Sequence, residues 1–328
     1  MDLFTHVIVA YLLSFGLTLG KSPVYIAAGA LAGGLPDSDI LLFPLATRFP
    51  LLRHHGITHS FLGVTIFAVG GGLLGPFVVP GASPLYLFLF MEVGGLSHIA
   101  LDGFTNFAVP PLAPFSQKEL RLDADRAVNG FTLVLSLAAF YILAGERNAV
   151  PFATWMLTGW VFMAIYGGYL LLRGVARWLA GRELRRSGYT AILPTSSPFT
   201  WVLIEEHESP HSWSTRYATY RLGRGIRERQ EPLEVPSKNV PPGPVHSLSE
   251  ALQQSYQPAM ERSHFLAASY RYAKVSQEGE RYRVHWFSLE FQVLGKAPGV
   301  LAFVDGKSGQ VETRRAWFKL RGLARPAP

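Results

Sequence analysis

The chain opens with long apolar runs separated by short polar segments. Four of these runs come close to the roughly 20 apolar residues that a helix needs to cross a bilayer. They cover about 60–80, 84–102, 127–145 and 150–172. Two earlier runs, 7–20 and 23–35, are shorter and rich in Gly and Ala, so they are tilted, buried among the others or re-entrant. The pattern predicts an α-helical membrane domain with four to six transmembrane helices.

The pattern changes beyond residue 186 to the period of two that is typical of strands. Strands are predicted at 199–204, 217–220, 281–287 and 300–304, with hairpin turns at 277–280 and 305–309. A helix is predicted to begin at Ser247, and the proline-rich stretch 232–244 resembles a linker. We therefore expect a membrane domain over 1–186, followed over 187–328 by a small α+β domain with a mostly antiparallel sheet.

Composition agrees with a membrane setting. Of 328 residues, 49% are hydrophobic and only 16% are charged, which is too apolar for a pair of ordinary soluble domains. The chain has no cysteine, so a bound metal would have to be held by imidazole and carboxylate groups. The first apolar run lacks a basic segment before it and a small-residue cleavage site after it, which predicts that it is retained.

The basic residues predict an orientation. If all six runs span the bilayer, the N-terminus, the 36–59 and 103–126 loops and the segment after 172 share one side. That side carries Arg48, Arg53, Lys118, Arg121, Arg126, Arg173, Arg177, Arg182, Arg185 and Arg186, and the other carries only Lys21 and Arg147. By the positive-inside rule, both termini are cytoplasmic and the protein is an integral inner-membrane protein. Anionic lipid headgroups are the expected partners of this basic face.

Seven side chains of metal-ligand type fall at that same face. They are His6, Asp37, Asp39, His54, His59, His98 and Asp102. Each small group also has an ordinary explanation, as a capped turn, an interfacial histidine cluster or a hydrogen bond at a helix end. Four imidazoles and three carboxylates at one membrane face are improbable by chance, so together they predict a metal site.

Spacing supports that interpretation in two places. His98 and Asp102 lie four residues apart, on one face of a predicted helix. The segment His54-His55-Gly56-Ile57-Thr58-His59 places three imidazoles directly before a spanning run, where polar groups without a ligand would be costly.

These motifs resemble a bacterial and archaeal family of inner-membrane proteins described as metal-dependent hydrolases, one branch of which is labelled LexA-binding. The residues that carry the resemblance are Asp2, Thr5 and His6; Leu35, Pro36, Asp37 and Asp39; His54, Gly56, Thr58, His59 and Ser60; His98, Asp102 and Thr105; and Pro114, Phe115 and Ser116. The chain departs from the family pattern at His55, where an arginine is usual, and at Asn106, where a proline is frequent. The first departure leaves His54 and His55 as alternative ligands, of which we prefer His54.

The chemistry that these residues permit is metal-assisted hydrolysis. Imidazole and carboxylate ligands suit zinc, and also manganese or iron. Seven candidate ligands exceed the three or four protein ligands that one zinc ion commonly takes. Of one or two ions, we therefore favour two that share one carboxylate, Asp39 or Asp37. Asp37 and His55 are the candidates for a general base.

The resemblance implies hydrolase activity. A looser similarity to zinc-dependent phospholipases and nucleases implies a phosphoester or ester substrate, which could be a lipid or a small molecule.

Glu92 lies deeper in the 84–102 run, off the face of His98 and Asp102. An ionisable group at that depth is a functional candidate. Glu92 could support the metal ligands from outside the coordination shell, form a hydrogen bond between helices, or be a protonated residue without a function. Together we favour these three roles over a catalytic one.

Two other functions are compatible with the sequence. A non-catalytic membrane anchor would hold a structural metal and present residues 187–328 to a protein partner. A metal or proton transporter would need ionisable residues through the bilayer depth, yet apart from Glu92 they cluster at one side. Evenly spread charge in the second domain disfavours nucleic acid as a partner, and its histidines, His207, His211, His246, His264 and His285, are expected to be surface or packing residues.

Overall fold

The computed structural model describes residues 1–42, 56–185, 188–208, 212–227, 233–236, 243–263, 270–290 and 296–319. The chain divides into two compact units, Met1–Arg177 and Trp178–Pro328. His54, His55, His211 and His264 lie outside the described residues.

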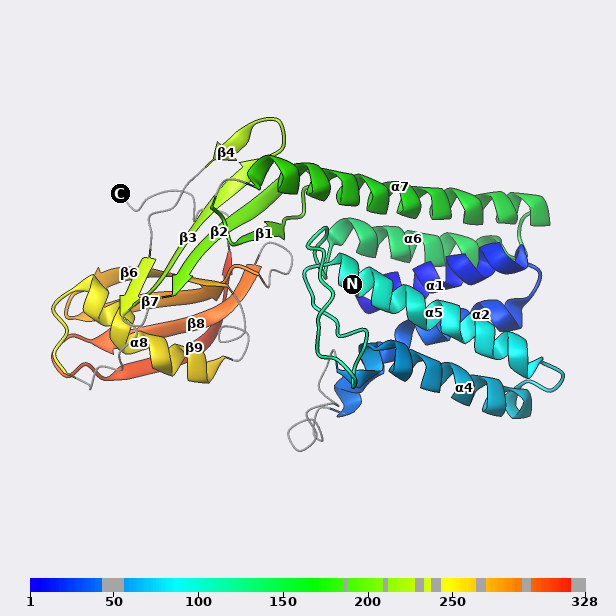
Figure 1. Cartoon of the computed structure of the whole chain (residues 1–328), viewed down its shortest axis with the longest axis horizontal. Coiled ribbons are helices and arrows are strands. Elements are labelled where there is room, and N and C mark those ends of the chain that lie inside the picture. The colour runs from blue at the N-terminus through cyan, green and yellow to red at the C-terminus, as the bar shows by residue number, and fades with distance from the viewer. Residues whose placement is uncertain are drawn as a thin grey trace. The chain divides into compact units, whose positions relative to one another are not determined.

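The first unit is a helical bundle (Figure 1). Its helices are α1 (Leu3–Thr18), α2 (Pro23–Gly34), α4 (Phe61–Val78), α5 (Pro84–Phe104), α6 (Gly130–Glu146) and α7 (Phe152–Leu184), the last of which continues past the unit boundary. Two short 3-10 helices, η1 (Pro36–Leu42) and η3 (Ile57–His59), lie between α2 and α4. Every predicted apolar run is therefore helical.

The helices begin where the sequence supplies caps. The Asp2 carboxylate accepts a hydrogen bond from the Thr5 backbone N–H at 3.0 Å, and the Ser60 hydroxyl accepts one from Gly63 at 3.1 Å. Pro23 and Pro84 occupy the first turns of α2 and α5, where a missing N–H costs little.

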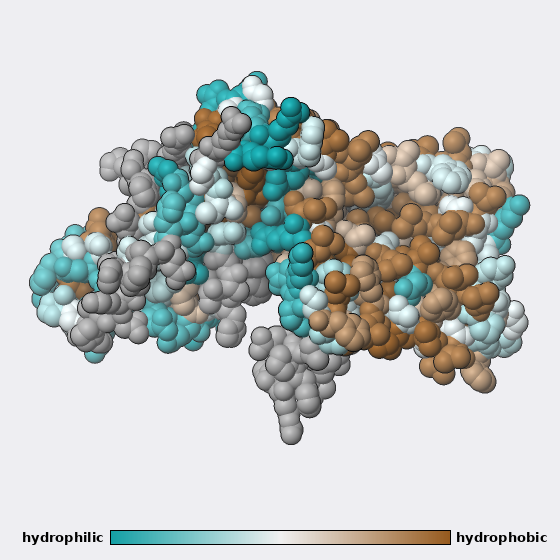
Figure 2. Space-filling model, in the orientation of Figure 1, coloured by the Kyte–Doolittle hydropathy of each residue, from teal (hydrophilic) through white to brown (hydrophobic). Residues whose placement is uncertain are grey.

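Three of these helices are long and apolar enough to cross a membrane, namely α4, α5 and α7. The run predicted at 127–145 forms α6, which is a shorter apolar helix like α1 and α2. Large apolar side chains such as Phe77, Tyr141 and Leu171 point outward from the bundle. Figure 2 shows hydrophobic residues covering much of the helical unit, as expected for a surface that faces lipid.

Glycines let α1, α2 and α5 pack closely. A Cβ added to Gly29 would lie 1.9 Å from the Ser14 hydroxyl, and one added to Gly94 would lie 2.1 Å from the Gly29 carbonyl oxygen. Such small-residue contacts are a common means of joining helices in membranes. They fix α2 against α1 on one side and α5 on the other.

The second unit contains two antiparallel sheets and one helix. The first sheet has the order β1–β2–β3–β4, with β5 also paired to β3, and the second has the order β6–β7–β8–β9. The strands are β1 (Ala191–Pro194), β2 (Thr200–Glu208), β3 (Ser212–Arg221), β4 (Gly225–Arg227), β5 (Leu233–Pro236), β6 (Arg271–Glu278), β7 (Arg281–Ser288), β8 (Lys296–Asp305) and β9 (Val311–Lys319). The predicted α+β class is confirmed.

Helix α8 (Leu248–Arg262) begins as predicted, because the Ser247 hydroxyl accepts a hydrogen bond from the Glu250 N–H. The core of this unit includes Trp286 of β7, whose indole N–H donates to the Ser255 hydroxyl of α8 at 2.9 Å. The predicted hairpins join β6 to β7 and β8 to β9, with Gly279 and Gly309 at positive φ.

Candidate metal centre

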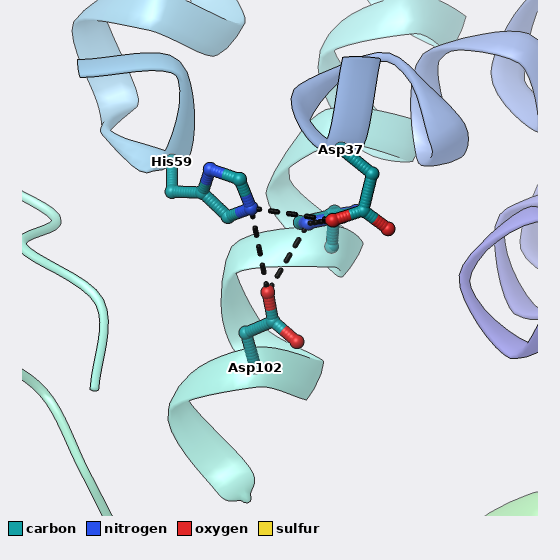
Figure 3. Close-up of side chains that lie close together, drawn as sticks. Asp37, His59 and Asp102 are labelled. Carbon is teal, nitrogen blue, oxygen red and sulfur yellow. Dashed lines mark ion pairs between the residues drawn. The ribbon is translucent and has the colours of Figure 1, made fainter. Parts of the chain in front are cut away.

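Four predicted ligands from three separate segments meet at one end of the bundle. Asp37 comes from η1, directly after α2, and His59 ends η3, just before α4. His98 and Asp102 lie one turn apart near the end of α5. One ligand atom from each of the four lies within 4.8 Å of all the others. Figure 3 shows Asp37, His59 and Asp102 pointing toward one another.

The distances between these atoms match the requirements of a shared cation. His59 Nε2 lies 3.5 Å from Asp37 Oδ1 and 3.6 Å from Asp102 Oδ2. His98 Nε2 lies 3.7 Å and 3.2 Å from the same two oxygen atoms. A tetrahedral zinc ion with bonds of about 2.1 Å places its ligand atoms roughly 3.4 Å apart. The four groups are therefore spaced as ligands around a common centre.

His98 is held in the orientation that a metal ligand needs. Its Nδ1 lies 2.8 Å from the Gly33 carbonyl oxygen. Because a carbonyl only accepts, this Nδ1 carries a proton and donates it, which leaves Nε2 as the ring nitrogen that faces the cluster. His98 Nε2 is buried and has no hydrogen-bond partner in the described part of the chain. A buried ring nitrogen without such a partner is what a metal ligand without its ion leaves behind.

His59 is oriented by a second carboxylate. Its Nδ1 lies 3.2 Å from Asp39 Oδ2, which also accepts a hydrogen bond from the Thr58 hydroxyl at 2.7 Å. A carboxylate on one ring nitrogen fixes the imidazole and strengthens the other nitrogen as a ligand. Asp39 therefore lies behind His59, on the side of its ring away from the centre.

Asp102 is held through its other oxygen. His6 Nε2 lies 3.1 Å from Asp102 Oδ1, and the amino group of Met1 also contacts this oxygen. The His6 ring stacks on His98 with ring centroids 3.7 Å apart. His6 thus supports both α5 ligands and is not one of the four groups that converge.

Burial leaves one open side. His59 and His98 are 0% exposed and Asp102 is 2% exposed, whereas the Asp37 side chain is 19% exposed. Water or a substrate would therefore approach next to Asp37.

Electrostatics around Asp37 and His59 favour a cation. Burial lowers the pKa of His59, but hydrogen bonds to Asp37 and Asp39 outweigh it and raise the pKa to about 9. Burial raises the pKa of Asp37, but the hydrogen bond from His59 and the charge of His98 outweigh it and lower the pKa. Without a metal, the His59 imidazole therefore holds a proton, and a bound metal ion would replace that proton.

Two other charged residues of the bundle, Glu92 and Arg173, are not among the four converging side chains. Glu92 accepts a hydrogen bond from Thr65 of α4 at 3.0 Å, which is the helix–helix contact among the alternatives considered for it. Arg173, which the sequence placed with the headgroup-binding basic residues, is 0% exposed and pairs with the Asp125 carboxylate at 3.0 Å. Arg173 is therefore buried in an ion pair inside the bundle and does not contact lipid headgroups.

Sequence analysis missed two supporting groups. The Thr58 hydroxyl donates to Asp39 behind His59, but the sequence indicated Thr58 only as part of a motif. Its position next to His59 was the signal that could have predicted this role. The Gly33 carbonyl carries no sequence signal, because its role depends on the packing of α2 against α5.

Comparison with known proteins identifies the family. The family described as YdjM inner membrane protein matches residues 1–177, which is more than half of the chain. The chain belongs to this family. The match includes all the helices that carry the four converging side chains, so the predicted inner-membrane class is confirmed, while the family description names neither a metal nor a reaction.

A bacterial relative adds similarity without a function. Over 193 residues the chain is 28% identical to the uncharacterised protein YfhP of Bacillus subtilis strain 168. The alignment covers 56% of this chain and 57% of the relative, so it spans little more than half of either protein. No solved structure matches the chain.

Proposed function

We propose that this protein is a membrane-embedded, metal-dependent hydrolase that cleaves a phosphoester or ester bond at the membrane face. The observation that carries the proposal is the convergence of Asp37, His59, His98 and Asp102 at distances that suit one cation. The buried Nε2 of His98, which has no hydrogen-bond partner among the described residues, adds to this observation.

Zinc is the ion we propose, with manganese or iron as alternatives. Two imidazoles and two carboxylates, with no thiolate in the chain, form a donor set that all three metals accept. The described residues provide four converging ligands, enough for one ion. A second ion would need donors such as His54 or His55, which lie outside the described residues.

The protein groups have distinct roles in this proposal. When bound, the ion supplies a nucleophilic water at neutral pH and polarises the ester. Asp37 would hold the ion next to the open side, and its carboxylate would accept a proton from a molecule that approaches there. Asp39 and His6 hold His59 and Asp102 in place, while the buried faces of His59 and His98 exclude bulk water.

A hydrolysis assay tests the proposal. We expect the purified full chain with one equivalent of zinc to cleave bis-p-nitrophenyl phosphate or a phospholipid, and Asp37→Asn to lower kcat by at least about 100-fold. Asp123→Asn, a change of the same type at a residue paired with Arg121, is the matched control and should retain activity.

The outcomes separate the alternatives. Tight metal binding without hydrolysis of any ester substrate would contradict the hydrolase and favour the anchor with a structural metal. Hydrolysis that survives both chelation and Asp37→Asn would contradict the metal mechanism.

A further inference from the structure

Two apolar cavities lie between the helices of the bundle and share one cationic side chain. The first, of about 700 Å³, lies among α1, α2, α6 and the start of α7. The second, of about 720 Å³, lies among α2, α4 and α5. Pro23, Ala27 and Arg147 line both of them. The cavities therefore flank the start of α2 and meet near Arg147.

The polar groups of these cavities gather at the end of the bundle away from the metal centre. Lys21 lies between α1 and α2, and Arg147 follows α6. His6 lies at the opposite end of α1, and Asp37 follows the opposite end of α2. The basic end of the cavities is thus apart from the proposed hydrolase site, while their apolar walls extend to Val7 and Leu35.

The two cations at this end have no carboxylate partner among the described residues. Neither Lys21 nor Arg147 forms an ion pair with a carboxylate in the described ranges, and both side chains are exposed. No carboxylate lies among the described residues that line either cavity. Basic groups next to apolar space between membrane helices attract anionic headgroups.

The walls suit hydrocarbon chains. The first cavity is lined by Ile26, Leu143 and Trp155, and the second by Leu31, Leu74 and Leu87. Each has the volume of an ordinary ligand pocket. In the second cavity, a Cβ added to Gly70 would have no atom within 4 Å, which shows open space along α4.

We propose that these cavities form a binding site for an anionic, two-chain phospholipid. The phosphate contacts Lys21 and Arg147, and one acyl chain enters each cavity on either side of α2. A two-chain amphiphile fits better than a single-chain one because both cavities open beside the same arginine.

Native mass spectrometry of the full chain in detergent tests this site. With phosphatidylglycerol and phosphatidylcholine supplied separately, we expect one phosphatidylglycerol to be retained more strongly than phosphatidylcholine. Arg147→Gln and Lys21→Gln should each lower the affinity for phosphatidylglycerol by about fivefold, the effect of one basic residue near an anionic headgroup. Lys307→Gln, at an exposed position between β8 and β9 of the second unit, is the charge control and should leave that affinity unchanged.

A second variant tests the cavities themselves. Ala27 is exposed and lines both, so Ala27→Trp should fill them and lower binding of both lipids. Leu157→Trp, on an exposed position of α7 that lines neither cavity, is the matched control.

Three results would overturn the site. They are equal retention of the two lipids by the wild type, an unchanged preference for phosphatidylglycerol in both charge variants, and unchanged binding in Ala27→Trp. The first result would reduce the cavities to ordinary contacts with surrounding lipid.

Discussion

At the scale of single residues, the carboxylates of the centre divide into two kinds. Asp37 and Asp102 direct an oxygen toward both imidazoles, whereas Asp39 contacts the far nitrogen of His59. Sequence spacing cannot make this distinction, because Asp37 and Asp39 are two residues apart in the same motif. The turn of η1 separates their directions.

This division predicts different effects for two substitutions. Asp39→Asn keeps a hydrogen-bond acceptor beside His59 but removes its charge, so we expect zinc affinity to fall by about 10- to 100-fold. His98→Ala removes a ligand and should abolish stoichiometric binding. Competition titration with a chromogenic chelator measures both. Complete loss of zinc in Asp39→Asn would show that Asp39 is itself a ligand.

At the scale of helices, close packing positions the ligands. Gly33 of α2 provides the carbonyl that orients His98, and Gly94 of α5 packs on the backbone of α2. The centre therefore depends on the distance between α2 and α5, although these helices are remote in sequence.

A glycine substitution tests this dependence. In Gly94→Ala, the new Cβ would lie 2.1 Å from the Gly29 carbonyl oxygen, so α2 and α5 must separate. We expect a lower Tm and weaker zinc binding. Gly70→Ala adds the same methyl group to a helix where no atom lies within 4 Å, and it should be tolerated. Equal Tm values for the two variants would contradict the packing account.

The lengths of the apolar runs, the period of two in the strands and one capping residue predicted most of these elements. Ser247 begins a helix as predicted, and the turns at Gly279 and Gly309 connect antiparallel strands. The sequence also indicated the four converging ligands, as part of a larger set. It could not show that His6 and Asp39 support the ligands from outside the group of four. Their positions depend on the stacking of His6 on His98 and on the contact of Asp39 with His59.

At the scale of the whole molecule, charge predicts how the bundle sits in the membrane. Among the basic residues that flank the apolar runs, only Lys21 and Arg147 were assigned to the side away from the metal centre. The proposed catalytic face is then cytoplasmic, and the proposed lipid site faces the other leaflet.

Cysteine labelling tests this orientation, because the natural chain has no cysteine to interfere. We expect Asn148→Cys to react with a membrane-impermeant maleimide in cells whose outer membrane alone is permeabilised. Lys118→Cys should react only after the inner membrane is opened. The reverse pattern would place the metal centre on the outer face and contradict the assigned topology.

The most direct test of the central claim is the metal content of the purified, full-length protein. We would compare the wild type with His59→Ala and Asp102→Ala, using Glu92→Gln as a control within α5. The account predicts near-stoichiometric zinc, manganese or iron in the wild type and the control, and its loss in both ligand variants. A wild type that binds no divalent metal when supplied with it, or ligand variants that both retain it, would contradict the metal centre.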